Sequence, residues 1–569
     1  MKKNLVVTFS LLLAILNSLS AQTPVPFVKT INNPNKWVDS VFKKMSRNEK
    51  IAQLFMVRAH TDLGQKYADS VAQVIKKQQL GGVVFFQGGP GRQALLTNQY
   101  QALAKIPLMI AMDAEWGLGM RLDSTVSYPY QMTLGAIQNN RLIYQMGQEV
   151  AKDFKRLGMH INFAPVMDIN NNPRNPVINY RSFGDNKYNV AQKSIAYMKG
   201  MQESGIFTTA KHFPGHGDTD VDSHYDLPKL PFTAARLDSL EMYPFKQAFA
   251  ENLSGIMVAH MNIPNLDSTK NLPSTLSKPI VTNILKEKLG FKGLIFSDAM
   301  GMKGVVKYFP NGEADVRGII AGNDVLELSE NTERAIHLIR KSIRHHRLTW
   351  EDINQKVKKI LEAKYWMGLN NLEEVNTQNV VTDLNRPASY QLIQNLTDAA
   401  VTVVKNDNII PLRNDFIRKT AVLCIGQQKE PAFYKSINQA YPNTILFLIP
   451  KDLSDTEYNQ VKASLQNFDQ IINVVYDTRK RPSSQLDYNN NLKSLITDVS
   501  KANTISVILA NPYTIAGLPG IEKSKSIIVG YQNSVEMENS AAKVVLGKLK
   551  SQGKLPVSVN SFFKYGDGL

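Results

Sequence analysis

Short apolar runs alternate with longer amphipathic segments over the first two thirds of the chain. Eight runs have the length and composition of buried strands: 55–57, 82–86, 108–113, 161–166, 207–211, 255–260, 293–297 and 324–328. Helical periodicity marks the segments between them, among them 140–157, 189–203, 237–251 and 280–288. Eight strands alternating with helices predict an α/β fold, a (β/α)8 barrel of TIM type at residues 45–365.

A second alternating pattern follows the predicted barrel. Residues 366–389, rich in asparagine, have the composition of a linker, and a helical segment at 390–404 comes next. Strand-like runs then occur at 420–425, 444–449, 471–476, 504–509 and 526–530, before an amphipathic helix at 536–549. This order predicts a smaller α/β sandwich domain at 390–569. Residues 22–44 are expected to form an extended lead-in to the barrel.

The N-terminus has the features of a cleavable export signal. Lys2 and Lys3 precede an apolar stretch at 5–16, which is too short for a comfortable membrane span, and small residues lead up to Ala21. We therefore expect residues 1–21 to be a signal peptide, the mature chain to be periplasmic or secreted, and no later segment to span a membrane.

The charge balance limits the classes of partner. The chain has 66 Lys and Arg against 49 Asp and Glu, a net charge of +17. This charge either keeps the surface soluble or attracts anionic polymers such as cell-wall glycans. Export and the absence of a dense basic run with aromatic residues argue against a nucleic-acid partner. Cys424 is the only cysteine, so no internal disulfide forms, and it is interpreted as a buried small hydrophobic residue.

Polar residues gather where the predicted barrel strands end. They are Asp113, the stretch from His160 to Asp168, Lys211, His212, His260, Asp298 and Glu327. The active site of such a barrel lies at the carboxyl ends of its strands. Each residue alone could be a helix cap or a loop polar group, but together they predict one shared pocket.

The loop from Lys211 to His224 holds three histidines and three aspartates. His224 lies two residues after Asp222, and a carboxylate beside an imidazole fixes its tautomer for general acid and base catalysis. A surface turn is the simpler alternative. Asp298 ends a strand-like run, so its carboxylate could attack a carbon centre or stabilise a cation, or it could merely cap the next helix.

Zinc is the strongest competing interpretation of this loop. His212, His216, His224 and His260 are residue types that ligate zinc. No His-x-His follows the first strand, however, and no His-Glu-x-x-His occurs in the chain. We therefore expect neither a metal nor another cofactor.

The run Lys211-His212-Phe213-Pro214-Gly215-His216-Gly217-Asp218-Thr219, followed by Asp222-Ser223-His224 and Ser297-Asp298-Ala299, closely resembles the N-acetylglucosaminidase branch of glycoside hydrolase family 3. Supporting motifs are Met112-Asp113-Ala114-Glu115 with Arg121, the stretch 162–168, and Arg181-Ser182-Phe183-Gly184. The resemblance covers the predicted barrel. The second domain is similar to the α/β sandwich of many members, but more loosely.

The resemblance implies a role for each of eight residues. Asp298 would be the nucleophile, His224 the general acid/base and Asp222 its dyad partner. The non-reducing sugar would be bound by Asp113, Arg121, Arg181, Lys211 and His212. The implied reaction is double displacement with retention, in which a covalent glycosyl-enzyme forms. The implied protein is an exo-β-N-acetylglucosaminidase, or β-N-acetylhexosaminidase, acting on cell-wall peptidoglycan fragments or chitin-type oligosaccharides. We expect it to be a monomer.

Other activities remain open at this point. Family relatives that are β-glucosidases or xylosidases usually take an acid/base glutamate from the second domain and carry Ser-Asp-Trp at the nucleophile, unlike this chain. Phosphorolysis of the same substrates and a silent glycan-binding protein are further alternatives. Glu115 is followed by Trp116-Gly117-Leu118-Gly119, where the family commonly has two glycines. Trp116 is expected either to stack near the sugar or to pack inward.

Overall fold

The computed structural model describes residues 23–412, 419–481, 486–501 and 503–569. The predicted signal peptide, residues 1–21, lies outside these ranges. In the part of the chain that the structure describes, no helix combines the length and the apolar composition needed to cross a membrane.

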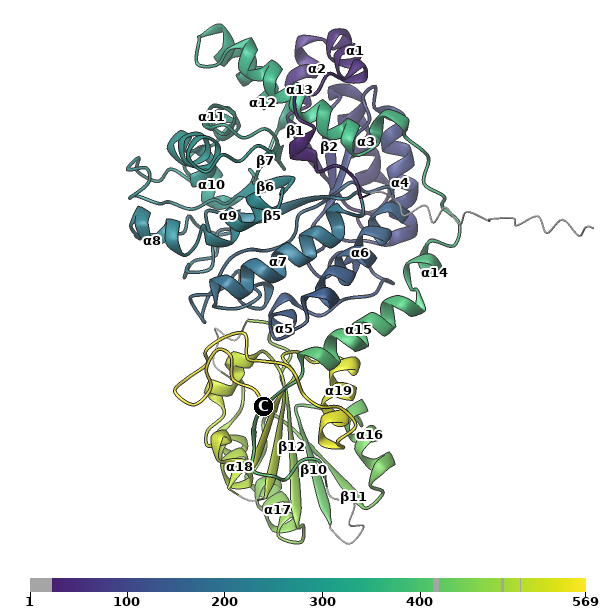
Figure 1. Cartoon of the computed structure of the whole chain (residues 1–569), viewed down its shortest axis with the longest axis vertical. Coiled ribbons are helices and arrows are strands. Elements are labelled where there is room, and N and C mark those ends of the chain that lie inside the picture. Colours follow the sequence, from purple (N-terminus) through teal and green to yellow (C-terminus); the bar gives the residue numbers. More distant parts are fainter. Residues whose placement is uncertain (1–22, 413–418, 482–485, 502) are drawn as a thin grey trace, which may run out of the picture.

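The first part of the chain is a closed barrel of eight parallel strands (Figure 1). The strands are β1 (Phe55–Ala59), β2 (Gly82–Phe85), β3 (Met109–Met112), β4 (Ile161–Asn162), β5 (Phe207–Phe213), β6 (Gly255–Val258), β7 (Leu294–Ser297) and β8 (Leu326–Glu327). Neighbours pair in chain order, β8 pairs with β1, and a parallel bridge between Phe296 and Val325 closes the ring. The predicted (β/α)8 barrel is confirmed.

Helices surround the barrel strands. They are α3 (Gln65–Gln78), α4 (Pro90–Leu103), α5 (Gln131–Gly135), α6 (Asn140–Arg156), α7 (Lys187–Gln202), α8 (Ala234–Ser239), α9 (Tyr243–Ala250), the π-helix η5 (Pro279–Lys288), α10 (Lys303–Val306), α11 (Glu313–Ala321), α12 (Thr332–Arg344) and α13 (Trp350–Trp366). The single helix predicted at 237–251 was wrong. Leu240 leaves the helical conformation, and Pro244 then lies in the first turn of a new helix, where its missing N–H costs nothing.

The predicted extended lead-in was also wrong. It contains the short turn η1 (Phe27–Lys29) and the helix α1 (Lys36–Lys44), followed by α2 (Arg47–Ala52). Asn35 caps α1 by accepting hydrogen bonds from the N–H groups of Trp37 and Val38. Phe27 is fully buried and packs 5.3 Å from the Phe207 ring, so this segment covers the end of the barrel opposite the polar strand ends.

The second part of the chain is a mixed six-stranded sheet with helices. Its strands are β9 (Thr402–Asn406), β10 (Thr420–Ile425), β11 (Thr444–Ile449), β12 (Gln470–Tyr476), β13 (Thr504–Leu509) and β14 (Ser526–Val529). The strand order is β11-β10-β12-β13-β14-β9, parallel except for β9. Its helices are α16 (Ala432–Ala440), α17 (Asp455–Leu465), α18 (Asn490–Ser500) and α19 (Val535–Val545). This unit is the expected smaller α/β domain, with Cys424 buried in β10.

Between the two sheets run η6 (Leu369–Asn371), α14 (Val380–Leu384) and α15 (Pro387–Ala400), which pass along one side of the molecule (Figure 1). The sequence predicted helix as far as residue 404, but the chain turns at Val401 and enters β9. The β-branched residues of Thr402–Asn406 favour this edge strand, which pairs antiparallel with β14.

The second unit docks on loops that follow β3 and β4, at the carboxyl ends of the barrel strands. Gln532 Oε1 accepts hydrogen bonds from the Tyr130 N–H at 3.0 Å and from Thr133 Oγ1 at 2.8 Å. Asn170 Nδ2 donates to the Tyr513 hydroxyl at 3.0 Å. The mouth of the barrel therefore faces the second unit.

Candidate active site

The polar strand ends converge on one cavity of about 360 Å³. Of the eight predicted site residues, all except Asp222 line it: Asp113, Arg121, Arg181, Lys211, His212, His224 and Asp298. Asp222 contacts His224 instead. The expected shared pocket is thus present.

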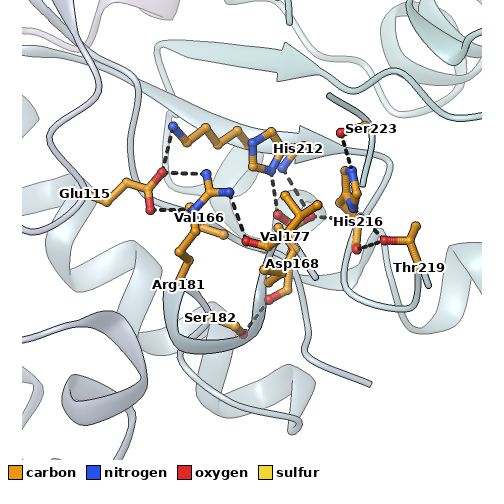
Figure 2. A network of polar contacts seen from close by, with 12 residues as sticks. Glu115, Val166, Asp168, Val177, Arg181, Ser182, His212, His216, Thr219 and Ser223 are labelled. Carbon is orange, nitrogen blue, oxygen red and sulfur yellow. Dashed lines mark hydrogen bonds and ion pairs between the residues drawn. The ribbon is translucent and has the colours of Figure 1, made fainter. Parts of the chain in front are cut away.

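Two carboxylates after β3 and three cations form the buried floor of this cavity. Lys211 Nζ lies 2.6 Å from Asp113 Oδ1 and 2.9 Å from Glu115 Oε1. Arg121 Nη2 donates to Asp113 Oδ2 at 2.6 Å, and Arg181 binds both oxygens of Glu115, at 2.7 and 2.9 Å (Figure 2). Burial opposes ionisation, but the neighbouring cations outweigh it and hold the pKa of Asp113 and of Glu115 below the ordinary range. Both carboxylates are therefore ionised.

Glu115 has a larger part in this site than the sequence motif indicated. Its side chain is 0% exposed and engages Arg181 and Lys211 together. Arg181 was predicted to bind sugar, and it lines the cavity, but its guanidinium is already paired bidentately. Glu115 therefore orients two cations of the site.

A second buried pair fixes His212. Asp168 Oδ2 lies 2.7 Å from His212 Nδ1, and Asp168 Oδ1 accepts the backbone N–H groups of His212 at 3.2 Å and His216 at 2.6 Å (Figure 2). Burial opposes ionisation of Asp168, but His212 lowers the pKa of that carboxyl. The contact between Nδ1 and the Asp168 carboxylate fixes the orientation of the His212 ring.

Asp298 directly follows β7 and is partly exposed to the cavity. Its Oδ1 accepts the Ala299 N–H at 2.7 Å. Burial raises its pKa, but His260, His212 and the Ala299 N–H outweigh burial and lower the pKa overall. His260 is held by Thr275 Oγ1, 2.7 Å from Nδ1, and by the Ala299 carbonyl, 3.1 Å from Nε2. An ionised carboxylate therefore faces the cavity.

The loop after β5 carries the His224–Asp222 pair. Asp222 Oδ1 lies 2.7 Å from His224 Nδ1 and also accepts the His224 N–H at 2.9 Å. The His224 side chain is 61% exposed, so its Nε2 is accessible to a ligand. The Asp226 carboxylate, further along the loop, accepts a hydrogen bond from Lys307 Nζ at 3.1 Å.

His216 is a structural residue of the same loop. Its Nε2 lies 3.0 Å from Ser223 Oγ and its Nδ1 lies 2.9 Å from Thr219 Oγ1 (Figure 2). Burial lowers its pKa to about 4, so the ring is neutral. Across the described ranges, no group of three or more His, Cys, Asp or Glu side chains is arranged to hold a metal ion.

Of two other residues that were predicted to belong to the pocket, Glu327 does and His160 does not. Glu327 lines the cavity as expected; it is 4% exposed, and its Oε1 lacks a hydrogen-bond partner in the described structure. Burial and the charges of Asp113 and Asp298 raise its pKa well above the ordinary value. His160, by contrast, does not belong to the pocket. It precedes β4, and its Nδ1 accepts the Ile110 N–H inside the barrel wall.

Trp116 packs inward, as one of the two sequence interpretations expected, whereas its stacking on a sugar stays a prediction. It is 7% exposed and packs against Tyr130 and Tyr180, with ring centroids 5.1 and 5.8 Å apart, yet it also lines the cavity. Sequence reasoning missed Arg58 and Arg481, which line the same cavity. Arg481 comes from the second unit, and no local sequence signal reports a contact made by docking.

Comparisons with known proteins show the family of both units. Residues 46–363 match the glycosyl hydrolase family 3 N-terminal domain, and residues 401–564 match its C-terminal domain. Beta-hexosaminidase A of Pseudoalteromonas piscicida is 27% identical over 551 residues, covering 86% of this chain and 91% of that protein. A beta-hexosaminidase of Nitrosospira multiformis is 30% identical over 270 residues, 46% of this chain and 76% of that protein.

Solved structures extend the likeness to both units. The family 3 beta-N-acetylglucosaminidase from Paenibacillus sp. FPU-7 superposes with a TM-score of 0.74 at 26% identity, covering 91% of this chain and 99% of that one. A beta-glucoside phosphorylase has a TM-score of 0.79 at 22% identity, covering 93% and 97%, which shows a shared fold alone. The chain belongs to glycosyl hydrolase family 3 and is a glycoside hydrolase.

Proposed function

We propose that this chain is a retaining exo-β-N-acetylglucosaminidase, that is, a β-N-acetylhexosaminidase. The observation that carries the proposal is the ionised Asp298 on the same cavity as the His224–Asp222 pair. A carboxylate nucleophile and a separate proton donor are what retaining hydrolysis requires. Relatives named beta-hexosaminidase and beta-N-acetylglucosaminidase support the sugar preference.

In the proposed first step, an Asp298 oxygen attacks the anomeric carbon while His224 gives its Nε2 proton to the leaving oxygen. The glycosidic bond breaks and a glycosyl ester of Asp298 forms. In the second step, His224 takes a proton from water, and the water oxygen displaces Asp298. Asp222 accepts a hydrogen bond from Nδ1 in both steps, so the ring carries protons on both nitrogens when it acts as the acid and on Nδ1 alone when it acts as the base.

The floor of the cavity is suited to a terminal sugar. Asp113 accepts and Lys211 donates hydrogen bonds, and His212, held through Nδ1 by Asp168, lines the same cavity. Vicinal hydroxyls of a pyranose need such paired donors and acceptors. The buried floor ends the pocket, which favours release of single terminal residues over internal cleavage.

Two related activities are weaker candidates. A β-glucosidase or xylosidase of this family would be expected to present a glutamate from the second domain, but the second unit contributes Arg481 to the lining of the cavity as described. Phosphorolysis would use the same residues with phosphate in place of water. Product analysis with and without phosphate distinguishes phosphorolysis from hydrolysis.

We further propose that the chain is exported and acts outside the cytoplasm on GlcNAc-containing cell-wall or chitin-type oligosaccharides. The support is the basic and apolar N-terminal pattern, which lies outside the described residues, together with the net charge of +17. Detection of the mature chain, beginning near Gln22, in a periplasmic or culture fraction would test the location.

The catalytic assignment is tested on an aryl N-acetylglucosaminide. Asp298→Ala and His224→Ala should each lower kcat by about a thousandfold or more. Asp222→Asn should also lose activity, whereas Asp220→Asn, an exposed aspartate of the same loop, is the matched control and should keep it. Added azide should rescue Asp298→Ala as the α-glycosyl azide. Wild-type rates in either Ala variant would refute the assignment.

A further inference from the structure

A second cavity, of about 400 Å³, lies at the base of the barrel. Asp324 lines this cavity and precedes β8, so the cavity is at the amino ends of the strands, opposite the candidate active site. Its walls come from η5, α11, α13 and the loops before β8 and α13. Among the described residues, the two cavities have no lining side chain in common. The basal cavity is therefore a separate feature of the barrel.

Cations outnumber carboxylates in the lining of the basal cavity. The cations are Lys278, Lys286, Arg347, Lys356 and Lys359, and the carboxylates are Asp324 and Asp352. Arg347 is paired with Glu313, 2.9 Å away. Asp352 accepts the N–H of Thr349 in the capping box that begins α13. Across the described ranges, Asp324 is the one carboxylate within ion-pair distance of the other three cations, namely Lys286, Lys356 and Lys359.

Asp324 is thus shared by three ammonium groups. Lys359 Nζ lies 2.8 Å from Asp324 Oδ2, and the Nζ atoms of Lys286 and Lys356 each lie 3.9 Å from Oδ1. Lys356 and Lys359 are three residues apart and so share one face of α13, which is the face that lines the cavity. One carboxylate balances one of these cations. With all three lysines protonated, about two positive charges are left without a partner.

These lysines are not ordinary surface residues. Lys356 is 9% exposed, and its Nζ donates to the Asn323 carbonyl at 2.8 Å. Burial, and then the charge of Lys286, lower the pKa of Lys356 to about 7, and burial also lowers the pKa of Lys359. A buried ammonium group is stabilised by an opposite charge close to it. An anion from solution would supply the charge that Asp324 alone does not.

The cavity has room for such an anion beside Lys286. Gly322 has a φ of +122°, and a Cβ at this position would lie 2.6 Å from Thr282 Oγ1 and 3.4 Å from Lys286 Nζ. A larger residue at this position would therefore occupy the space next to the ammonium group. The volume of the cavity is in the range of sites that hold small molecules.

We propose that the basal cavity binds a phosphate group, to whose oxygens Lys286, Lys356 and Lys359 donate hydrogen bonds. A phosphate dianion has the charge that balances the two cations left by Asp324. Its oxygens point in several directions and can accept from three ammonium groups at once. The ligand is inorganic phosphate or the phosphate of an ester, because the exposed Lys278 marks a side of the cavity that is open to solvent.

Titration calorimetry with inorganic phosphate, at constant chloride concentration, tests the proposal. Wild type should bind with a Kd of about 1 mM or less. Lys286→Gln and Lys356→Met should each raise this Kd about tenfold or more, as expected for the loss of a hydrogen bond to a charged group. Lys66→Gln, at an exposed lysine of α3, is matched in charge and should keep the wild-type Kd. Arg481→Gln removes a cation of the candidate active site and should also keep it.

Absence of phosphate binding by wild type, or an equal Kd in Lys286→Gln, would overturn the inference. So would a loss of binding confined to Arg481→Gln, because phosphate would then occupy the candidate active site. The Lys286 side chain is 29% exposed, so its variant is expected to fold, and an unchanged thermal unfolding midpoint checks this.

Two further ligands distinguish the sources of the phosphate group. Glycerol 3-phosphate represents a soluble ester, and vesicles of phosphatidylcholine with phosphatidic acid represent a lipid headgroup. Binding that Lys286→Gln weakens in one of these arms, and not in the other, identifies the source. If neither ligand binds whereas inorganic phosphate does, the site holds the free ion.

Discussion

His216 Nε2 lies 3.0 Å from Ser223 Oγ, and this contact joins the two halves of the loop that carries His224. The first half is fixed in turn by Asp168, which accepts the His216 N–H and also binds the His212 ring. The buried Asp168 carboxylate therefore holds two residues: His212, which lines the cavity, and His216, at the start of the loop that carries the proposed proton donor His224.

Removing the contact between His216 and Ser223 should slow catalysis but should leave substrate binding largely unchanged. Ser223→Ala deletes one hydrogen bond, worth about 1 kcal/mol, so the productive position of His224 should be less populated. We expect kcat on an aryl N-acetylglucosaminide to fall about threefold to tenfold, with a smaller change in KM. Ser239→Ala, at the exposed end of α8, is the control. A kcat equal to wild type in Ser223→Ala would show that the contact does not position the loop.

The same loop rests on helix α10 at a point where only glycine fits. A Cβ on Gly304 would lie 2.9 Å from the Asp226 carbonyl oxygen and 3.0 Å from that of Ser223. Gly304→Ala should therefore displace the loop, lower kcat and increase proteolysis between residues 217 and 228. Gly91→Ala in α4, where nothing lies within 4 Å, should keep full activity. Equal behaviour of the two variants would contradict the prediction.

Lys211 is expected to be essential for stability as well as for binding. In Lys211→Met the buried carboxylates Asp113 and Glu115 would lose their shared cation, which should lower the free energy of unfolding by about 3–5 kcal/mol at pH 7. Lys193→Met removes a buried lysine that has an asparagine rather than a carboxylate partner, and should cost far less. Denaturant unfolding of both variants measures the difference, and similar losses would count against a special role for Lys211.

The same ion pairs predict how stability depends on pH. Folding lowers the pKa of Glu115 from its ordinary 4.5 to about 2, and that of Asp113 also falls. Their contribution is complete above the unfolded pKa and is lost as pH falls through the folded pKa. Wild-type stability should therefore decrease between about pH 4.5 and 2. Lys211→Met should show a shallower acid slope in unfolding measured across this window, and a steeper slope would oppose the prediction.

Glu327 should make the stability of the folded protein decrease, rather than increase, as pH rises. Its folded pKa is raised, so the folded state keeps a proton that the unfolded state releases, and stability falls as pH rises above the unfolded pKa. Glu327→Gln is neutral at every pH and removes this loss. Its stability relative to wild type should increase with pH above about 5, by at most about 1.4 kcal/mol per pH unit. A difference that does not vary with pH would show that Glu327 titrates normally.

Much of the barrel and its floor could be predicted from the sequence. The carboxyl ends of parallel strands meet at one rim, so Asp113, Lys211 and Asp298 had to converge once the eight strands were recognised. The Asp222–His224 contact is local, because its partners are two residues apart. His160 was misplaced because it was grouped with the residues that follow β4, whereas it precedes the strand and so lies at the end opposite the pocket; the predicted start at 161 was right and the predicted end at 166 was too late. Periodicity does not define the boundary of so short a strand.

The part that could not be predicted depends on docking between the two units. Arg481 enters the cavity because polar contacts such as Gln532 with Tyr130 seat the second unit on the barrel mouth. Such contacts have no periodic or motif signature in a single sequence. The contact between Glu115 and Arg181 could not be predicted either, because the sequence shows only an Asp-x-Glu motif after a strand and does not indicate the partner of the glutamate.

Because Arg481 is presented by a separate sheet, the wall of the cavity is shared between two folding units. The side chains proposed to break the bond come from the barrel, while Arg481 lines the same cavity from a loop of the second unit. We therefore expect that exchange of a few residues after β12 would change which leaving groups the cavity accepts and would leave the barrel side chains in place.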